Sequence, residues 1–210
     1  YSNYDYYSGF TRPTGILIIP ETVSFKGISY AVTGISAYAF NGCPLTSVII
    51  PNSVTFIGGY AFAGCGSLTM INIPDSVSSI GDYAFRNCSG LTSIDIPDSV
   101  TSIASYTFAG CSSLTSIEIP NSVTSIGENA FGECYNLTSI VIPNSVTVIR
   151  DRAFSSCRNL TSITISNAIT YIGEQAFSNC GNEIFTQYDN AYYLGNCENP
   201  YIALIKAKSA

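Results

Sequence analysis

Apolar and polar residues alternate in short stretches along most of the chain. In the stretch LTSIDIP, Ile94 and Ile96 flank a polar residue, and in SVTSI the apolar positions are Val100 and Ile103. Alternation with a period of two and β-branched residues is typical of half-buried strands. Proline ends the first stretch because it cannot donate to a strand ladder, and the Asn or Asp after it suits a turn. The pattern predicts two short strands joined by a turn.

This pair of stretches recurs as a unit that reads LTSIxIPxSVTSIGxxAFxxCxx. Its copies follow one another every 23 residues, and they are clean from Leu45 to Cys180. The AFxxC part, here called the AF–C segment, is too short for an α-helix and predicts a single helical or 3-10 turn. Repetition at this period indicates a solenoid, in which stacked copies bury faces that one copy could not bury alone. We expect a β-rich, right-handed, curved stack.

Phenylalanine and cysteine return once in every unit. Phenylalanine is expected to form a continuous aromatic spine, and cysteine to occupy a small site that faces the backbone. Parallel stacking at about 4.8 Å does not bring Cβ atoms to the roughly 3.5–4.5 Å that a disulfide needs. We therefore interpret the column as a structural ladder of buried free thiols. Its members are Cys43, Cys65, Cys88, Cys111, Cys134, Cys157 and Cys180.

Other roles for the cysteines are disfavoured by what surrounds them in the sequence. The sequence contains no CxxC pair of the kind that holds a metal ion. A nucleophilic thiol would need an activating base or cation nearby. Cys197 lies outside the ladder, and both a disulfide with Cys180 and a packed or free thiol remain open for it.

Composition excludes several classes of function. The chain has no histidine, which removes Ser-His-Asp and Cys-His catalysis and His-ligated zinc. Its net charge is −6, and the one basic cluster, Arg150, Arg152 and Arg158, is interrupted by Asp151, so nucleic-acid binding is not expected. No apolar run is long enough to insert into a membrane. We expect no cofactor, no metal and no catalytic residue.

One column of residues is free to vary between units, and it should lie on an outward sheet face. It lies between the two isoleucines of the first strand and reads Ile49, Asn72, Asp95, Glu118, Val141 and Thr164. We take Asn72, Asp95, Glu118, Val141 and Thr164 as candidate ligand-binding residues. Asp95 and Glu118 should be about 5 Å apart, a separation found in retaining glycosidases. An open face without an aromatic platform favours a solvated face over catalysis.

A second variable position carries tyrosine in four successive units, at Tyr38, Tyr60, Tyr83 and Tyr106. Two interpretations of this aromatic stripe remain open. The rings can pack against the AF–C segment, or they can offer a stacking surface to a protein or a carbohydrate.

The repeated unit resembles the BspA-like, Treponema-type leucine-rich repeat, and the resemblance covers residues 16–182. It implies a leucine-rich-repeat solenoid over 16–182, with a capping hairpin within about 16–40. Residues 1–15 would then be a polar N-terminal segment, and 183–210 a C-terminal capping or inter-block segment. Ser36, Ala104 and Arg150 replace the glycine after the second isoleucine. We expect Arg150 to need local adjustment if that position requires a glycine conformation.

The resemblance also implies a function. Such proteins are typically bacterial and extracellular or attached to the cell surface, with the leader and anchor outside this chain. They act as adhesin-like, non-catalytic modules that bind a protein or glycan on host matrix, a host cell or another microbe. The family has no shared catalytic residues, so no enzyme activity is expected. The alternatives are a structural spacer that displays other domains and, more remotely, a glycan-active enzyme.

Overall fold

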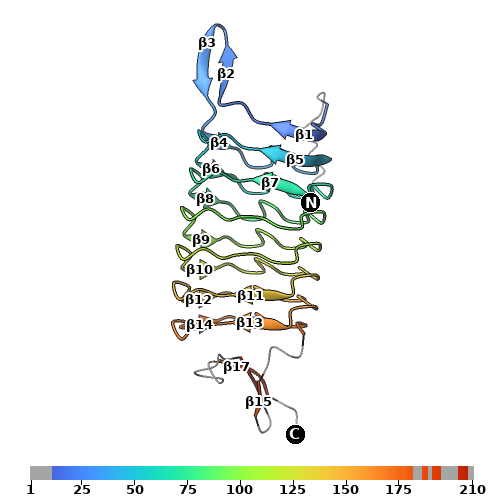
Figure 1. Cartoon of the computed structure of the whole chain (residues 1–210), viewed down its shortest axis with the longest axis vertical. Helices are drawn as coiled ribbons and strands as arrows, with labels where there is room; N and C mark the ends of the chain where they lie inside the picture. Colours follow the sequence, from blue (N-terminus) through green and yellow to red (C-terminus); the bar gives the residue numbers. More distant parts are fainter. Residues whose placement is uncertain (1–10, 182–185, 189–190, 195–202, 208–210) are drawn as a thin grey trace.

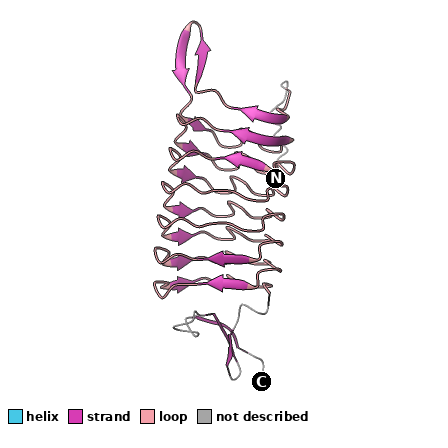
Figure 2. Cartoon of the chain, in the orientation of Figure 1, coloured by secondary structure: helices cyan, strands magenta, loops and turns pink. Residues whose placement is uncertain are grey.

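The computed structural model describes residues 11–181, 186–188, 191–194 and 203–207. It is a β-solenoid in which each repeat forms one layer of a long stack (Figure 1). Two columns of short strands run along the stack, and turns connect them within each layer (Figure 2). The predicted solenoid of stacked 23-residue repeats is confirmed, with two short strands in most of its layers.

The first strand of the repeat forms one of these columns. Its strands pair in parallel, and residues one repeat apart lie opposite each other, as Ser139 and Ser162 do. The column consists of two separate ladders, β1-β5-β7 and β11-β13. Its strands are β1 (Gly15–Ile18), β5 (Leu45–Ile49), β7 (Met70–Asn72), β11 (Ser139–Val141) and β13 (Ser162–Thr164). Residues 91–96 and 114–119, which also carry the pattern, form no ladder.

The second strand of the repeat forms the other column, again with parallel pairing. Here every repeat contributes a two-residue strand, although the ladder is interrupted between β8 and β9. The strands are β4 (Gly34–Ile35), β6 (Phe56–Ile57), β8 (Ser79–Ile80), β9 (Ser102–Ile103), β10 (Ser125–Ile126), β12 (Val148–Ile149) and β14 (Tyr171–Ile172).

The AF–C segment is a run of consecutive hydrogen-bonded turns, and the described residues contain no helix (Figure 2). Its amide groups alternate between two kinds of partner. Ala61 N–H donates to Gly58 O of the same repeat, whereas Phe62 N–H donates to Ala84 O of the following repeat. The internal bonds are those of the predicted 3-10 turn, and the others make this segment a third column of bonds between repeats.

The core fills the space between the three columns. Six phenylalanines, from Phe62 to Phe177, are almost fully buried, and neighbouring rings are stacked with centroids 5.2–5.7 Å apart. The leucine, valine and isoleucine of each unit pack around them. The predicted aromatic spine is confirmed. Its physical basis is that each ring covers the faces of its neighbours and removes their apolar area from water.

Two antiparallel elements flank the stack in the sequence. The hairpin of β2 (Thr22–Phe25) and β3 (Ile28–Ala31) projects beyond the N-terminal end of the stack (Figure 1), and residues 20–31 are all exposed. Near the C-terminus, β15 (Thr186–Tyr188), β16 (Ala191–Leu194) and β17 (Ala203–Ala207) form a three-stranded sheet. The two alternatives for Cys197 lie outside the described residues.

Candidate functional site

The open sheet face is the outward surface of the first strand column, and it carries the predicted candidates. Asn72, Asp95, Glu118, Val141 and Thr164 are all exposed, whereas the isoleucines beside Asn72, Asp95 and Glu118 are buried. Ile49, at the N-terminal end of the same column, is 47% exposed, and Val141 is 61% exposed. The alternation of the strands therefore directs the variable side chains into solvent and the constant ones into the core.

The β1–β5 pairing extends this face with further apolar side chains. Ile16 lies opposite Ser47 and Ile18 lies opposite Ile49, so both isoleucines share the face. Ile16, Ile18 and Met70 are each more than 60% exposed. The open sheet face is thus apolar at its N-terminal end, and its only charged side chains, Asp95 and Glu118, lie near its middle.

The strand ladder is open at the two acidic residues. Between residues 91–96 and 114–119, the one backbone bond in the described structure runs from Thr115 N–H to Thr92 O, at 3.3 Å. Like charges at neighbouring positions disfavour close cross-strand pairing. Because these amide and carbonyl groups are not bonded between strands, the middle of the face can form hydrogen bonds with a ligand or with water.

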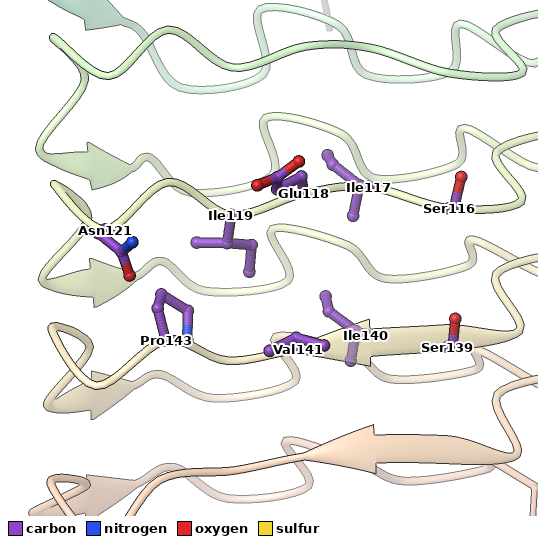
Figure 3. A pocket seen from close by; sticks show the side chains of 9 residues that line it. All are labelled: Ser116, Ile117, Glu118, Ile119, Asn121, Ser139, Ile140, Val141 and Pro143. Carbon is purple, nitrogen blue, oxygen red and sulfur yellow. The ribbon is translucent and has the colours of Figure 1, made fainter.

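A shallow hollow of about 390 Å³ lies beside this opening, between two neighbouring repeats (Figure 3). One side comes from residues 116–121 and the other from residues 139–143. Its polar groups include the Glu118 carboxylate and the hydroxyls of Ser116 and Ser139, and Val141 contributes apolar area. The hollow therefore brings together two of the predicted candidates, Glu118 and Val141. Asn72, Asp95 and Thr164 lie on the same face but outside it.

The hollow could not be predicted from the sequence pattern. The pattern at 114–119 is that of a regular strand, so the pattern alone predicts a closed ladder there. The one available signal was the pair of acidic residues in successive units. Among the described residues, no three carboxylate, thiol or imidazole groups are grouped so that they could hold a metal ion.

The aromatic stripe forms a continuous stack along the side of the solenoid. The rings of Tyr38, Tyr60, Tyr83 and Tyr106 are nearly parallel, with centroids 4.4–4.7 Å apart and interplanar angles of 7°. All four residues have positive φ, between 58° and 62°. Since the inner rings are covered on both faces by their neighbours, the stripe leaves the edges and not the faces of these rings accessible.

The C-terminal end of the stripe is fixed by polar contacts. The Tyr106 hydroxyl donates a 2.7 Å hydrogen bond to Glu128 Oε1. This bond, together with burial, raises the pKa of Tyr106 to about 12. Arg86 lies over the Tyr83 ring, 5.7 Å from its centroid. In later repeats, Arg152 and Gln175 occupy the position of the tyrosines, and Arg152 Nε donates to Gln175 Oε1 at 3.0 Å.

All seven column cysteines are free thiols. From Cys65 onward, each S–H donates to a phenylalanine carbonyl of the preceding repeat, as in the 3.2 Å bond from Cys88 to Phe62 O. Burial raises the pKa of Cys111 to about 12. Cys180 ends the column and is partly exposed, and its hydrogen bond with Cys157 lowers its pKa.

Comparison with known proteins shows which family this architecture belongs to. The family model of the BspA type leucine rich repeat region matches residues 33–158 and 79–197. No curated protein matches the chain. In the described part of the chain, no helix is long and apolar enough to span a bilayer.

Solved structures of similar proteins share both fold and sequence. A Treponema pallidum leucine rich repeat protein is 34% identical, with a TM-score of 0.71 over 79% of this chain and 76% of its own. A leucine rich cell surface protein from Faecalibacterium prausnitzii is 38% identical, with a TM-score of 0.74 over 92% of this chain and 54% of its own. A Bacteroides ovatus leucine-rich repeat protein is 34% identical, with a TM-score of 0.63 over 79% of this chain and 49% of its own. The chain therefore spans only about half the length of the last two proteins.

Repeat pattern, layered fold and sequence likeness agree, and the chain belongs to the BspA-type leucine-rich repeat family.

Proposed function

We propose that this chain is a non-catalytic, adhesin-like binding module of a bacterial cell-surface or secreted protein, and that its partner docks on the open sheet face. Leucine-rich repeat proteins generally serve as protein-interaction modules, and stacked repeats provide the extended surface for it. The Faecalibacterium prausnitzii relative is described as a cell surface protein, which supports the same placement for this chain.

One observation carries this proposal. The constant apolar positions of the repeat are buried, while the variable column of the first strand is exposed along the whole stack. A position that packing does not constrain can follow the requirements of a partner. The shape of the face supports binding rather than turnover, because Asp95 and Glu118 lie on an open surface and their nearest hollow is shallow.

The distribution of side chains on the face indicates the chemistry of the partner. Asp95 and Glu118 form a small acidic centre, and Ile16, Ile18 and Met70 form an apolar end. A complementary partner presents a cation to the centre and apolar side chains to the end, which describes a protein surface on host matrix, a host cell or another microbe.

Reversing the charge of the acidic centre tests whether the partner docks on the open sheet face. We expect Asp95→Arg with Glu118→Arg to weaken capture of the protein partner at least tenfold, because two attractive contacts become repulsive. Binding is measured against immobilised host matrix proteins and a glycan array, with circular dichroism to show that the stack still folds.

Asp75→Arg with Asp98→Arg is the matched control, since these exposed carboxylates also lie one repeat apart but belong to the turns after the prolines. Binding that both double variants leave intact would contradict docking on the open sheet face. Hydrolysis of a glycan that Asp95→Asn abolishes would contradict the non-catalytic role.

A further inference from the structure

The register of the β2–β3 hairpin places all of its large apolar side chains on one face. Val23 lies opposite Tyr30, and Phe25 lies opposite Ile28. Opposite residues of an antiparallel pair share a face, as do residues two apart along a strand. These four side chains therefore form one surface, here called the hairpin apolar face. The other face carries only small residues, namely Thr22, Ser24, Ser29 and Ala31.

The hairpin apolar face is bare. Phe25 is 63% exposed and Ile28 is 57% exposed, while Val23 and Tyr30 are each about half exposed. The hairpin projects along the long axis of the molecule, beyond the N-terminal end of the stack (Figure 1). A two-stranded hairpin is marginally stable in water by itself, and an exposed apolar face of this kind marks an interaction site.

Opposite charges lie at the two ends of this face. Lys26 is in the turn at the tip, and its Nζ lies 5.3 Å from the centroid of the Phe25 ring, which places the ammonium group at the apolar face. Glu21 is at the base, where its carbonyl oxygen accepts a 2.8 Å hydrogen bond from Val32 N–H. Such a surface is self-complementary when two copies meet tip to base.

We propose that the hairpin apolar face packs against the same face of a second copy of this chain, with the two hairpins antiparallel. By two-fold symmetry, Lys26 of each copy meets Glu21 of the other. The two stacks extend in opposite directions from the paired hairpins, because each hairpin projects along its own stack axis (Figure 1). This contact leaves the open sheet face of both copies free, and it is independent of the proposed function.

The charges favour a second copy over a lipid surface. Membrane attachment through a short apolar element needs a cluster of cations near anionic headgroups. Lys26 is the one cation of the hairpin, and the chain as a whole carries a net charge of −6.

The size of the face sets the strength of the contact. An aromatic side chain buries about 150–250 Å², so four side chains per copy reach only the low end of specific interfaces. The dimer is therefore weak in dilute solution. It forms at high local concentration, as on a surface that displays many copies.

Sedimentation equilibrium of the whole chain, from about 10 μM to about 1 mM, tests the proposal. We expect the mean mass to rise from 22.4 kDa toward twice that value. Phe25→Ser with Ile28→Ser removes the rise, whereas Ser24→Lys on the opposite face leaves it unchanged. These residues lie outside the core, so circular dichroism of the stack should not change.

Charge variants keep the test independent of any effect on hairpin folding. Lys26→Glu should weaken self-association about tenfold, because it opposes like charges at two symmetric points. Lys26→Glu with Glu21→Lys should restore it. A wild-type chain that stays monomeric over the whole range overturns the proposal, as does equal association of wild type and Lys26→Glu. A monomeric chain that co-sediments with vesicles of phosphatidylcholine and phosphatidylserine overturns it in favour of a lipid surface.

Discussion

At the scale of single residues, space and not conformation constrains the glycine that follows the second-strand isoleucine in four of the seven repeats. A Cβ at Gly127 would lie 2.7 Å from backbone atoms of Ala104 and Ser105, and one at Gly58 would lie 2.5 Å from Ala37 N. None of the glycines at this position has positive φ. The condition under which Arg150 was expected to need local adjustment, a glycine conformation at this position, is therefore not met. Arg150 also has an ordinary φ, and its N–H donates to Ile126 O at 2.9 Å.

We expect Gly127→Ala to lower the free energy of unfolding by about 1–3 kcal/mol, because the new methyl group must push apart the backbones of two repeats. Urea unfolding followed by circular dichroism measures the change. Gly66→Ala is the control: its Cβ would meet only the Ser89 hydroxyl, at 3.3 Å. It should change stability by less than about 0.5 kcal/mol. An equal loss of unfolding free energy in the two variants would show that the close approach of neighbouring backbones is not the cause.

Among the elements, the AF–C segment departs most from regular secondary structure. The residue just before each segment and the residue before its cysteine have positive φ, for example Tyr83 with Asn87 and Arg152 with Ser156. These left-handed residues turn alternate amide groups along the stack, where they bond to the following repeat. Tyrosine and arginine adopt this conformation at a cost, which the interlocking bonds and the aromatic stripe offset.

The same segment controls the reactivity of the thiols. Burial raises the pKa of the inner thiols, so at pH 8 they are protonated and poorly nucleophilic. Cys180 has the opposite shift and is partly exposed. In a Cys197→Ser variant, we expect a thiol reagent at pH 8 to label Cys180 alone in the folded protein, and all seven column thiols in guanidinium chloride. Peptide mapping identifies the labelled sites, and rapid labelling of Cys111 in the folded state would contradict this account.

For the molecule as a whole, stability comes from stacking equivalent layers in register. Equivalent bonds recur between successive layers, such as Thr124 N–H to Thr101 O and Thr147 N–H to Thr124 O, both 2.9 Å. A layer in the middle of the stack is thus interchangeable with the next one. This is the behaviour of a quasi-one-dimensional solenoid.

Deleting residues 114–136 removes one complete repeat and joins Ser113 to Leu137 in phase. We expect the shortened chain to fold with an unchanged circular dichroism spectrum per residue and a smaller urea m-value, because less surface is buried in total. Deleting only 114–124 should abolish cooperative unfolding, since it puts the phenylalanine spine out of phase. A cooperative transition in that second variant would contradict stacking in register.

Much of this architecture could be predicted from the sequence by itself. The 23-residue period, the alternation around Ile94 and the recurring phenylalanine determine a β-solenoid, the residues of its core and the outward column of its open sheet face. They do so because identical units can bury their apolar positions only by stacking on one another. Local pattern and global fold then agree in the repeats whose two strands both form.

Other features were decided only by the tertiary structure. The ladder opens at Asp95 and Glu118 although the local pattern there favours strands, and a hollow lies beside Glu118. The close approach at Gly127, the ring faces covered within the aromatic stripe and the bare face around Phe25 depend on spacings between segments that are distant in the sequence. A pattern of residue types fixes which side chains face inward, but only the folded chain fixes the distances between them.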